Sequence, residues 1–285
     1  MKQVSWLVSA CIALVIFLFL KGFAFDVKRV NSSDMLANYK YGDAVVIKKL
    51  LNFYAVNDVV YFEFPSPDSV LTKTFLLQRV VALPGDTLII TDKVVYVNGK
   101  YLDRNAGVKH NYFLKAKGKL DSAFCARYNL TEGGEISDKL DYSFALTRTE
   151  YESIKSDSMI VSIERKSEKS NTPDENCFPY SPHYPWNLDH YGKLYLPKIN
   201  DTLALDTVSI QLYSGIIHDY EKNNLEVKRD SIFINGELCH TYVVKKNYYF
   251  VLGDNRDNAI DSRTWGFLPE SQILGKIIYP IRRAQ

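Results

Sequence analysis

Residues 253–269 read GDNRDNAIDSRTWGFLP, a dense run of aspartate, asparagine and arginine that follows the apolar stretch YYFVL at 248–252. Aspartate and asparagine side chains bond to nearby backbone groups in turns, and arginine pairs with carboxylates through two parallel hydrogen bonds. The segment therefore predicts a tightly tied turn after a strand, although it is unusually polar for a mere connection. The residues expected to tie it are Asp254, Asn255, Arg256, Asp261, Ser262 and Arg263.

Short strands are predicted upstream of this turn. Alternating and β-branched residues in 42–50, 57–64, 75–83, 86–92 and 93–102 indicate a strand in each range. The dipeptides Asn98-Gly99 and Asn235-Gly236 each predict a two-residue hairpin. A helix is expected over 207–223, because apolar side chains recur there at helical spacing, and a shorter helix is expected near 147–154.

The middle of the chain changes character. Residues 103–180 contain more lysine, acidic residues, serine and asparagine, which is typical of a solvated surface. The sequence therefore predicts a mainly β body built from residues 26–102 and 241–285, with an inserted α/β cap domain at 103–240. With 285 residues and 46% hydrophobic content, the chain is long enough to bury such a core.

Charge and cysteine content exclude two kinds of site. The chain has 35 basic and 33 acidic residues with both signs scattered, so we expect no nucleic-acid partner. The four cysteines, at 11, 125, 177 and 239, show no CxxC spacing and no nearby histidine cluster, so we expect no metal site. A disulfide between Cys125 and Cys177 is possible in an oxidising compartment, but the sequence alone does not establish it.

An apolar run opens the chain. Residues 6–20 read WLVSACIALVIFLFL, and counting to Phe25 the run reaches the roughly 20 residues that a membrane-spanning helix needs. A cleaved signal peptide is the alternative, because Gly22 and Ala24 could form a small-residue cleavage site. We favour an uncleaved anchor over residues 1–25, because the run exceeds the usual apolar core of a signal peptide, roughly 7–15 residues. Lys2 favours a cytoplasmic amino terminus, with the body on the far side.

Four ordered segments resemble the bacterial type I signal peptidases. The run at 253–269 is similar to their last signature, GDNRDNSxDSRxWGxVP, and QRVVALPGD at 78–86 is similar to KRVVGLPGD. NDVVYF at 57–62 resembles their GDxVxF strand, and SSDM at 32–35, followed by Gly42 and Asp43, resembles SxSMxPTLxxGD. The likeness covers about residues 1–100 and 185–285, and segments 186–192 and 248–250 resemble the longer variant common in Bacteroidota.

This resemblance implies a signal-peptidase β fold with one N-terminal transmembrane helix. It also implies a place in the bacterial inner membrane, with the body on the periplasmic side and no cofactor. The implied ligands are signal peptides of exported proteins or another extended peptide segment, bound by the protein alone or within a membrane protein complex. A shared fold does not by itself establish a shared activity.

The departures from the family all fall on its chemistry. Asp34 stands where the family has the nucleophilic serine, Gln78 where it has the general-base lysine, and Ala259 where a further serine orients that lysine. Serine attack needs a hydroxyl and a base whose pKa is lowered toward neutrality, and a glutamine amide cannot act as that base. No intact catalytic set is therefore expected, although Ser32 matches the family's oxyanion-hole serine.

Neighbouring residues do not replace the lost groups. Ser33 alternates to the opposite face of a strand from position 34, and Lys73 is five residues from position 78, so a regular strand turns it away too. Using Ser32 as nucleophile would remove the oxyanion donor that it matches. Aspartic-protease chemistry at Asp34 would need a second carboxylate sharing a proton, and the sequence identifies none.

We therefore expect a catalytically inactive relative that keeps the β scaffold, with Asp34 and Gln78 hydrogen-bonded to each other in place of the dyad. Such a scaffold can still bind an extended peptide by strand addition. The expected groove is lined by Asp34, Met35, Leu36, Val80, Val81, Ala82 and Leu83. An active signal peptidase with non-standard chemistry and a purely structural component of a membrane complex are the two alternatives.

Overall fold

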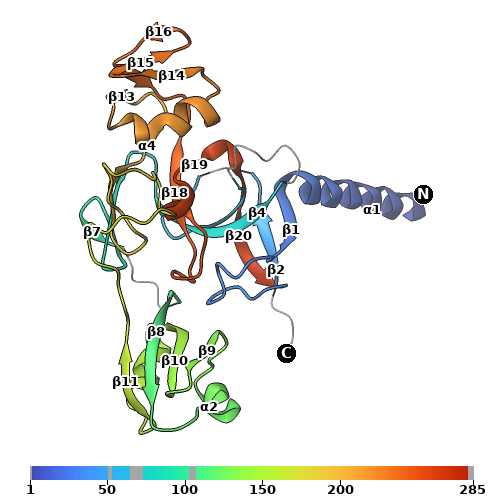
Figure 1. The fold of residues 1–285 in the computed structure, drawn as a ribbon. Coiled ribbons are helices and arrows are strands. Elements are labelled where there is room, and N and C mark those ends of the chain that lie inside the picture. Colours follow the sequence, from blue (N-terminus) through green and yellow to red (C-terminus); the bar gives the residue numbers. More distant parts are fainter. Residues whose placement is uncertain (1, 51–52, 65–72, 103–106, 282–285) are drawn as a thin grey trace.

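The central sheet of the body joins the two ends of the chain (Figure 1). The computed structural model describes residues 2–50, 53–64, 73–102 and 107–281. Within these residues, seven antiparallel strands form the sheet in the order β1-β2-β20-β3-β4-β18-β19. They are β1 (Phe25–Arg29), β2 (Ala44–Lys48), β20 (Ile273–Ile281), β3 (Val59–Glu63), β4 (Phe75–Ala82), β18 (Tyr248–Leu252) and β19 (Leu268–Pro269). The mainly β fold predicted from the sequence is confirmed.

Strand β20 is the last strand of the chain, yet it lies inside this sheet. It lies between β2 and β3, where Tyr279 pairs with Val46 and Gly275 pairs with Tyr61. Gly275 has to be small, because a Cβ there would lie 2.6 Å from the carbonyl oxygen of Lys48. The last strand of the chain is thus inserted among the first ones, and both ends of the sequence contribute to one body.

A second sheet of the body contains the first predicted hairpin. Strands β5 (Thr87–Thr91), β6 (Val94–Val97) and β7 (Lys100–Tyr101) are joined by β12 (Tyr191–Tyr195) in the order β12-β5-β6-β7. Asn98 and Gly99 have φ angles of 51° and 76°, the left-handed values of a type I′ turn. Asn235 and Gly236, at 54° and 88°, repeat this geometry. Both predicted hairpins are confirmed.

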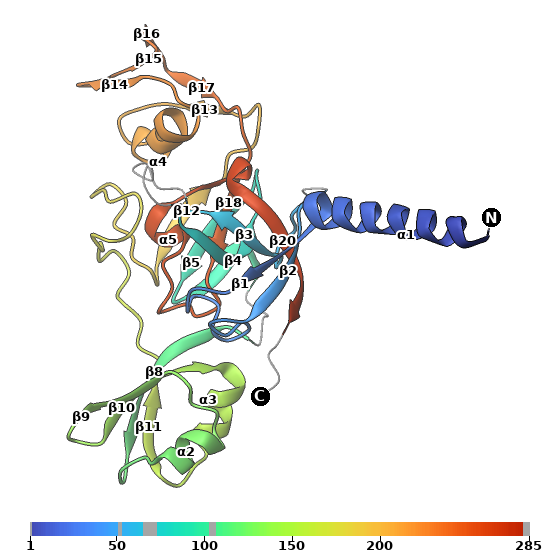
Figure 2. The same ribbon diagram turned by 90° about the vertical axis from the view of Figure 1, so that its right-hand side faces the viewer.

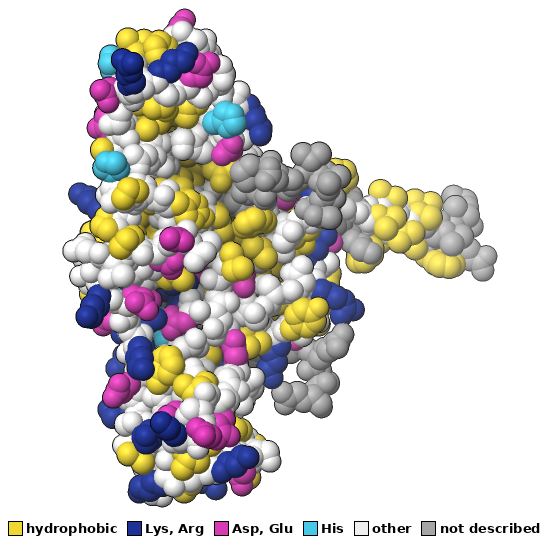
Figure 3. Space-filling model, viewed as in Figure 1, with side chains coloured by type: hydrophobic (Ala, Val, Ile, Leu, Met, Phe, Trp, Pro, Cys, Tyr) yellow, Lys and Arg dark blue, Asp and Glu magenta, His cyan; other side chains and the backbone are white. Residues whose placement is uncertain are grey.

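Residues 109–164, which we call the cap, form a separate sheet below the body in Figure 1. Its strands are β8 (Lys109–Ala116), β9 (Gly133–Ser137), β10 (Asp141–Thr147) and β11 (Ile160–Glu164), and its helices are α2 (Ser122–Arg127) and α3 (Arg148–Lys155). Buried side chains such as Leu114, Phe144 and Ile154 give the cap a hydrophobic cluster of its own. Charged side chains of both signs lie on its surface (Figure 3), which agrees with a solvated insertion.

The rest of the predicted insertion packs with the body, which corrects the single inserted domain expected at 103–240. Its elements are β12, β13 (Thr202–Ala204), α4 (Ile210–Gly215) with a π-helical turn (Ile216–Tyr220), β14 (Leu225–Lys228), β15 (Ser231–Ile234), β16 (Glu237–Leu238) and β17 (Thr241–Val243). Leu194 and Ile216 share a hydrophobic cluster with Leu88 and Phe250 of the body. Burial against these strands, which sequence composition does not reveal, assigns the segment to the body. The helix predicted at 207–223 is confirmed over 210–220.

The N-terminal helix leaves the body (Figure 2). Helix α1 (Lys2–Phe19) continues through a π-helical turn (Leu20–Ala24) into β1. Its apolar side chains face outward, as the exposed fractions of Ile12, Val15 and Phe17, 55%, 64% and 59%, demonstrate. Among the described residues, no helix combines the length and the apolarity that crossing a membrane requires.

The cysteines are free. Cys125 lies in α2 and packs in the cap cluster, whereas Cys177 is buried in the main cluster of the body. The disulfide between them that the sequence left open is therefore not formed. Burial raises the pKa of the Cys177 thiol to about 12, so this thiol stays protonated at neutral pH.

Candidate functional site

Asp34 and Gln78 contact each other inside the body. Asp34 lies in the turn between β1 and β2, and Gln78 lies within β4. The Nε2 of Gln78 donates hydrogen bonds to Asp34 Oδ2 at 3.1 Å and to the carbonyl oxygen of Ile260 at 2.7 Å. Asp34 is 7% exposed and Gln78 is 0% exposed. The hydrogen-bonded pair predicted in place of a serine–lysine dyad is confirmed.

The third substituted position, Ala259, lies at the same site. A Cβ added to Gly253 would lie 2.4 Å from the Cβ of Ala259 and 2.7 Å from the carbonyl oxygen of Asp34. The N–H of Asn255 donates to that same carbonyl oxygen at 2.8 Å. The turn at 253–261 thus brings positions 34, 78 and 259 together, but neither Gln78 nor Ala259 offers a group that accepts a proton.

Gly253→Ala is expected to lower the free energy of unfolding by about 1–3 kcal/mol, the usual cost of forcing extra atoms into a packed interior. The new methyl group would collide with Ala259 and with the backbone of Asp34. Urea denaturation measures the loss. Gly134→Ala is the matched control, because a Cβ there meets nothing within 4 Å. An equal loss in both variants would contradict the close packing at Gly253.

The Asp34 carboxylate has no cationic partner among the described side chains. Burial raises the pKa of Asp34 to about 6 and the nearby Asp261 carboxylate adds to the rise, while the Gln78 hydrogen bond and the Ser32 hydroxyl act in the opposite direction. Ser32 Oγ lies close to Asp34 but is buried without a hydrogen bond of normal geometry, and so is Gln78 Oε1. The site therefore combines an uncompensated carboxylate with two unsatisfied oxygens.

Asp34→Asn is expected to stabilise the protein at pH 8 and to have little effect below pH 5. A carboxyl whose pKa is about 6 in the folded state and 3.8 in the unfolded state holds its proton more tightly when folded. The parent therefore loses stability as pH rises through this window, by an amount on the order of 2–3 kcal/mol. Guanidinium denaturation at pH 4.5, 6 and 8 measures the difference between the two proteins. A difference in stability between the two proteins that is larger at pH 4.5 than at pH 8 would contradict this prediction.

A second carboxylate is not free to share a proton with Asp34. Asp261 accepts hydrogen bonds from Arg263, at 2.9 Å to Oδ1 and 2.8 Å to Oδ2, and from the N–H of Gly253 at 3.2 Å. An aspartic-protease dyad needs two carboxyls that share one proton, which this fully paired group does not provide. Lys73 is also outside the site, because it pairs with Glu63 at 3.0 Å and its side chain is 65% exposed.

The motif residues hold the site in place, as the polar turn predicted. Arg79 makes two hydrogen bonds to Asp254, at 2.7 and 2.5 Å. The N–H of Asp254 donates to the sulfur of Met35 at 3.3 Å. Arg256 and Ser262 also bond to backbone: Arg256 Nε donates to the Gly253 carbonyl at 2.9 Å, and Ser262 Oγ accepts the Val251 N–H at 3.1 Å. These contacts fix the turn at 253–261 and helix α5 (Ser262–Trp265) against β18.

Four of the predicted groove residues are not accessible. The buried ones are Met35, Val80, Val81 and Ala82, each at most 1% exposed. Strand β4 lies between β3 and β18, so it is not an edge strand, and both the N–H and the C=O of Val80 are bonded to residues 57–58. The expectation that these four side chains line an open groove does not hold, because they are buried in the core. A peptide cannot add to β4 as a strand either, because both edges of β4 are paired. Leu36 and Leu83 remain partly exposed.

Sequence reasoning does not single out two residues at this site. Ile260 is 62% exposed, and its backbone carbonyl accepts a hydrogen bond from Gln78, so the residue adjoins the dyad positions. Glu132 of the cap accepts hydrogen bonds from Asn255 at 2.8 and 3.1 Å and from Asn258 at 3.1 Å. Ile260 could have been identified from the sequence, because it is an apolar residue within an otherwise polar turn. Nothing local signals Glu132, because its contact joins residues 123 positions apart.

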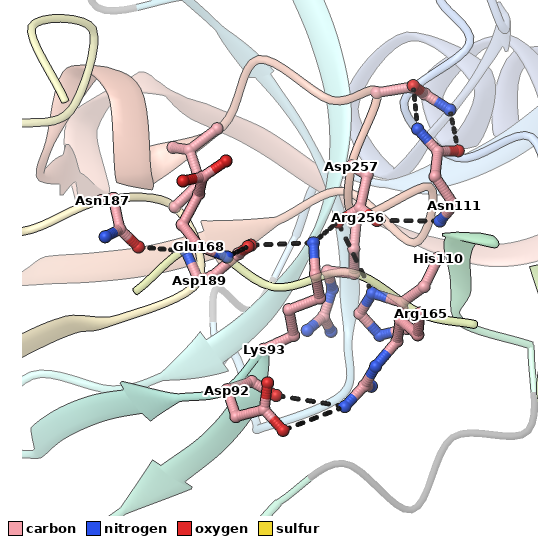
Figure 4. A network of polar contacts seen from close by, with 12 residues as sticks. Asp92, Lys93, His110, Asn111, Arg165, Glu168, Asn187, Asp189, Arg256 and Asp257 are labelled. Atoms are coloured by element: carbon pink, nitrogen blue, oxygen red, sulfur yellow. Dashed lines mark hydrogen bonds and ion pairs between the residues drawn. The ribbon is translucent and has the colours of Figure 1, made fainter. Parts of the chain in front are cut away.

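A buried ion network joins the cap to the same turn (Figure 4). Lys93 contacts both Asp189 and Asp257 at 2.9 Å, and the N–H of Asn111, at the start of the cap, donates to Asp257 at 2.8 Å. Burial acts to raise the pKa of Asp257, but the contacts with His110 and Lys93 outweigh it and hold that pKa well below its ordinary value. The cap is therefore tied to the turn at 253–261, which carries Ala259.

Comparison with known proteins identifies the family of this chain. The chain matches the family described as signal peptidase, peptidase S26, over residues 3–167 and 198–281. The signal peptidase I of Buchnera aphidicola subsp. Baizongia pistaciae (strain Bp) is 22% identical over 282 residues, which cover 93% of this chain and 72% of that protein. The signal peptidase I of Haemophilus influenzae is 53% identical over 85 residues, 29% of this chain and 23% of that protein. The protein therefore belongs to the peptidase S26 family of signal peptidases.

Proposed function

We propose that this protein is a catalytically inactive signal peptidase relative that binds an extended peptide at the surface around Asp34. The observation that carries the proposal is the hydrogen bond from Gln78 Nε2 to Asp34 Oδ2, 3.1 Å long. By the resemblance, Gln78 supplies an amide where the family's chemistry needs a base, and Asp34 supplies a carboxylate where it needs a hydroxyl. The relatives are named signal peptidase I, and their scaffold without that chemistry suits a peptide-binding subunit in protein export.

The accessible residues around Asp34 suit a peptide ligand. Ser33 and Ile260 are exposed, and Leu36 and Leu83 are partly exposed. Apolar side chains that surround a few placed polar groups are typical of ligand sites, where the polar groups set orientation. These residues replace the buried part of β4 as the proposed contact surface.

Membrane attachment is part of the proposal. Helix α1 presents apolar side chains to its surroundings, as Figure 3 shows for the helix that leaves the body. An exposed apolar surface of this kind stabilises contact with lipid or with another apolar partner. We place the protein at the bacterial inner membrane, with the body on the periplasmic side.

Ile260→Ser is expected to weaken peptide binding by about tenfold, because it removes an apolar contact of about 1–2 kcal/mol. Full-length protein in detergent is titrated into a fluorescein-labelled synthetic signal peptide, and anisotropy reports the Kd. Val227→Ser is the matched control, since Val227 is 49% exposed on β14, a strand that does not belong to the site. Equal weakening by both substitutions would rule out a peptide surface at Ile260.

The two alternative functions predict different results for peptide binding and for preprotein cleavage. An active signal peptidase with non-standard chemistry, for which Ser32 is the surviving family residue, would cleave preproteins without any substitution. A purely structural component would bind no peptide, and its contacts would run through the cap. The peptide titration separates the structural alternative from the proposal, and a cleavage assay separates the active one.

A further inference from the structure

Two oxygen atoms beside the Asp34 carboxylate are buried without a hydrogen-bond partner. They are Gln78 Oε1 and Ser32 Oγ, and the Gln78 amide bonds to Asp34 Oδ2 and not to Oδ1. Gln78 cannot satisfy its own oxygen by rotating, because its Nε2 already serves Asp34 and the Ile260 carbonyl. Buried acceptors are rarely left unpaired in folded proteins, so this arrangement requires an explanation.

No cation among the described residues pairs with Asp34. Asp34 is 7% exposed, and the charged group that acts on it is another carboxylate, Asp261. Arg263, which follows the turn, is bonded to both oxygens of Asp261. A carboxylate buried without a cation is costly, and a ligand that supplied one would gain both charge pairing and hydrogen bonds.

Ligand chemistry follows from this arrangement. A carboxylate or phosphate would be repelled by Asp34, and a carbonyl group would add another acceptor. A backbone amide supplies one donor, whereas an ammonium group supplies three donors and no acceptor. Calcium would take six to eight oxygen ligands, more than these side chains offer, and the described residues contain no cluster of three metal-ligating side chains.

We propose that the Asp34 site binds a protonated primary amine, either the amino terminus of a peptide or a lysine side chain. Asp34 Oδ1 pairs with the ammonium charge, and Gln78 Oε1 and Ser32 Oγ accept its remaining hydrogens. This inference rests on the proposed function, because the amine is carried by a bound peptide. It adds a selection rule: among peptides with the same apolar residues, one that presents an amine to Asp34 binds most tightly.

The test uses three forms of one peptide amide, Ala-Gln-Ala-Gln-Ala: a free amino terminus, an acetylated terminus, and an acetylated form with lysine at the central position. Each is titrated at pH 7 into full-length protein in detergent by calorimetry. The free-amine or the lysine form is expected to bind about tenfold more tightly than the acetylated peptide. Whichever of the two binds more tightly identifies the source of the amine.

Asp34→Asn removes the charge but keeps the shape, and it is expected to abolish the preference. Ser32→Ala, which removes one acceptor, is expected to reduce it while folding normally. Equal affinity for all three peptides would overturn the inference and leave the proposed peptide binding intact. Failure of all three to bind would overturn both.

Discussion

The triple variant Asp34→Ser, Gln78→Lys, Ala259→Ser is expected to cleave a preprotein that the parent leaves intact. The three positions are already adjacent: Gln78 Nε2 lies 3.1 Å from Asp34 Oδ2, and Ala259 packs against Gly253, which contacts the backbone of Asp34. A lysine at 78 would lie beside a serine at 34, the arrangement in which a base activates a hydroxyl. Restoring it is expected to raise cleavage by at least about 10³-fold over the parent.

All three substitutions are needed together, because residues that act as one catalytic unit are strongly non-additive. The single variants Asp34→Ser and Gln78→Lys are therefore expected to stay inactive and serve as controls. Cleavage is followed on gels with purified, detergent-solubilised protein and a panel of preproteins. A triple variant that folds with parental stability yet cleaves none of them would show that more than the dyad has been lost.

Arg263→Leu is expected to lower the free energy of unfolding by about 3–5 kcal/mol. Arg263 is 3% exposed and Asp261 is 0% exposed, and the arginine donates two hydrogen bonds to that carboxylate. It also bonds to the carbonyl oxygens of Leu188 and Arg256. Removing the cation leaves a buried carboxylate unpaired, which costs far more than the net stabilisation that the pair provides.

A double variant separates the charge from the packing. Asp261→Asn together with Arg263→Leu leaves no unpaired charge, so it is expected to be more stable than Arg263→Leu alone. Denaturant unfolding of the parent, both single variants and the double variant completes the cycle. A double variant that loses the sum of the two single losses would indicate that the ion pair is not coupled.

The elements that the sequence predicted well are those set by neighbouring residues. Asn98-Gly99 specifies a hairpin because both residues tolerate positive φ, and the strands at 75–83 and 86–92 follow from β-branched repeats. The division of 103–240 was missed, because it depends on Leu194 and Ile216 packing against distant strands. Solvent exposure and packing partners depend on residues that are far apart in the chain, so a single sequence does not reveal them.

The site shows the same limit. The resemblance to signal peptidases was enough to predict that Asp34 and Gln78 meet, and the 3.1 Å hydrogen bond confirms it. It was not enough to predict that Val80 is buried, because only the sheet order places β4 between two partners. Glu132 was missed for a similar reason, since the cap reaches Asn255 through tertiary packing alone.

The central proposal is that this scaffold, with Asp34 in place of the nucleophilic serine, has no catalytic activity. The most direct test incubates the full-length parent and Asp34→Ala, each purified in detergent, with preproteins and follows the release of mature chains. We predict no cleavage by either protein. Cleavage by the parent that disappears in Asp34→Ala would contradict the account and identify a carboxylate-dependent signal peptidase.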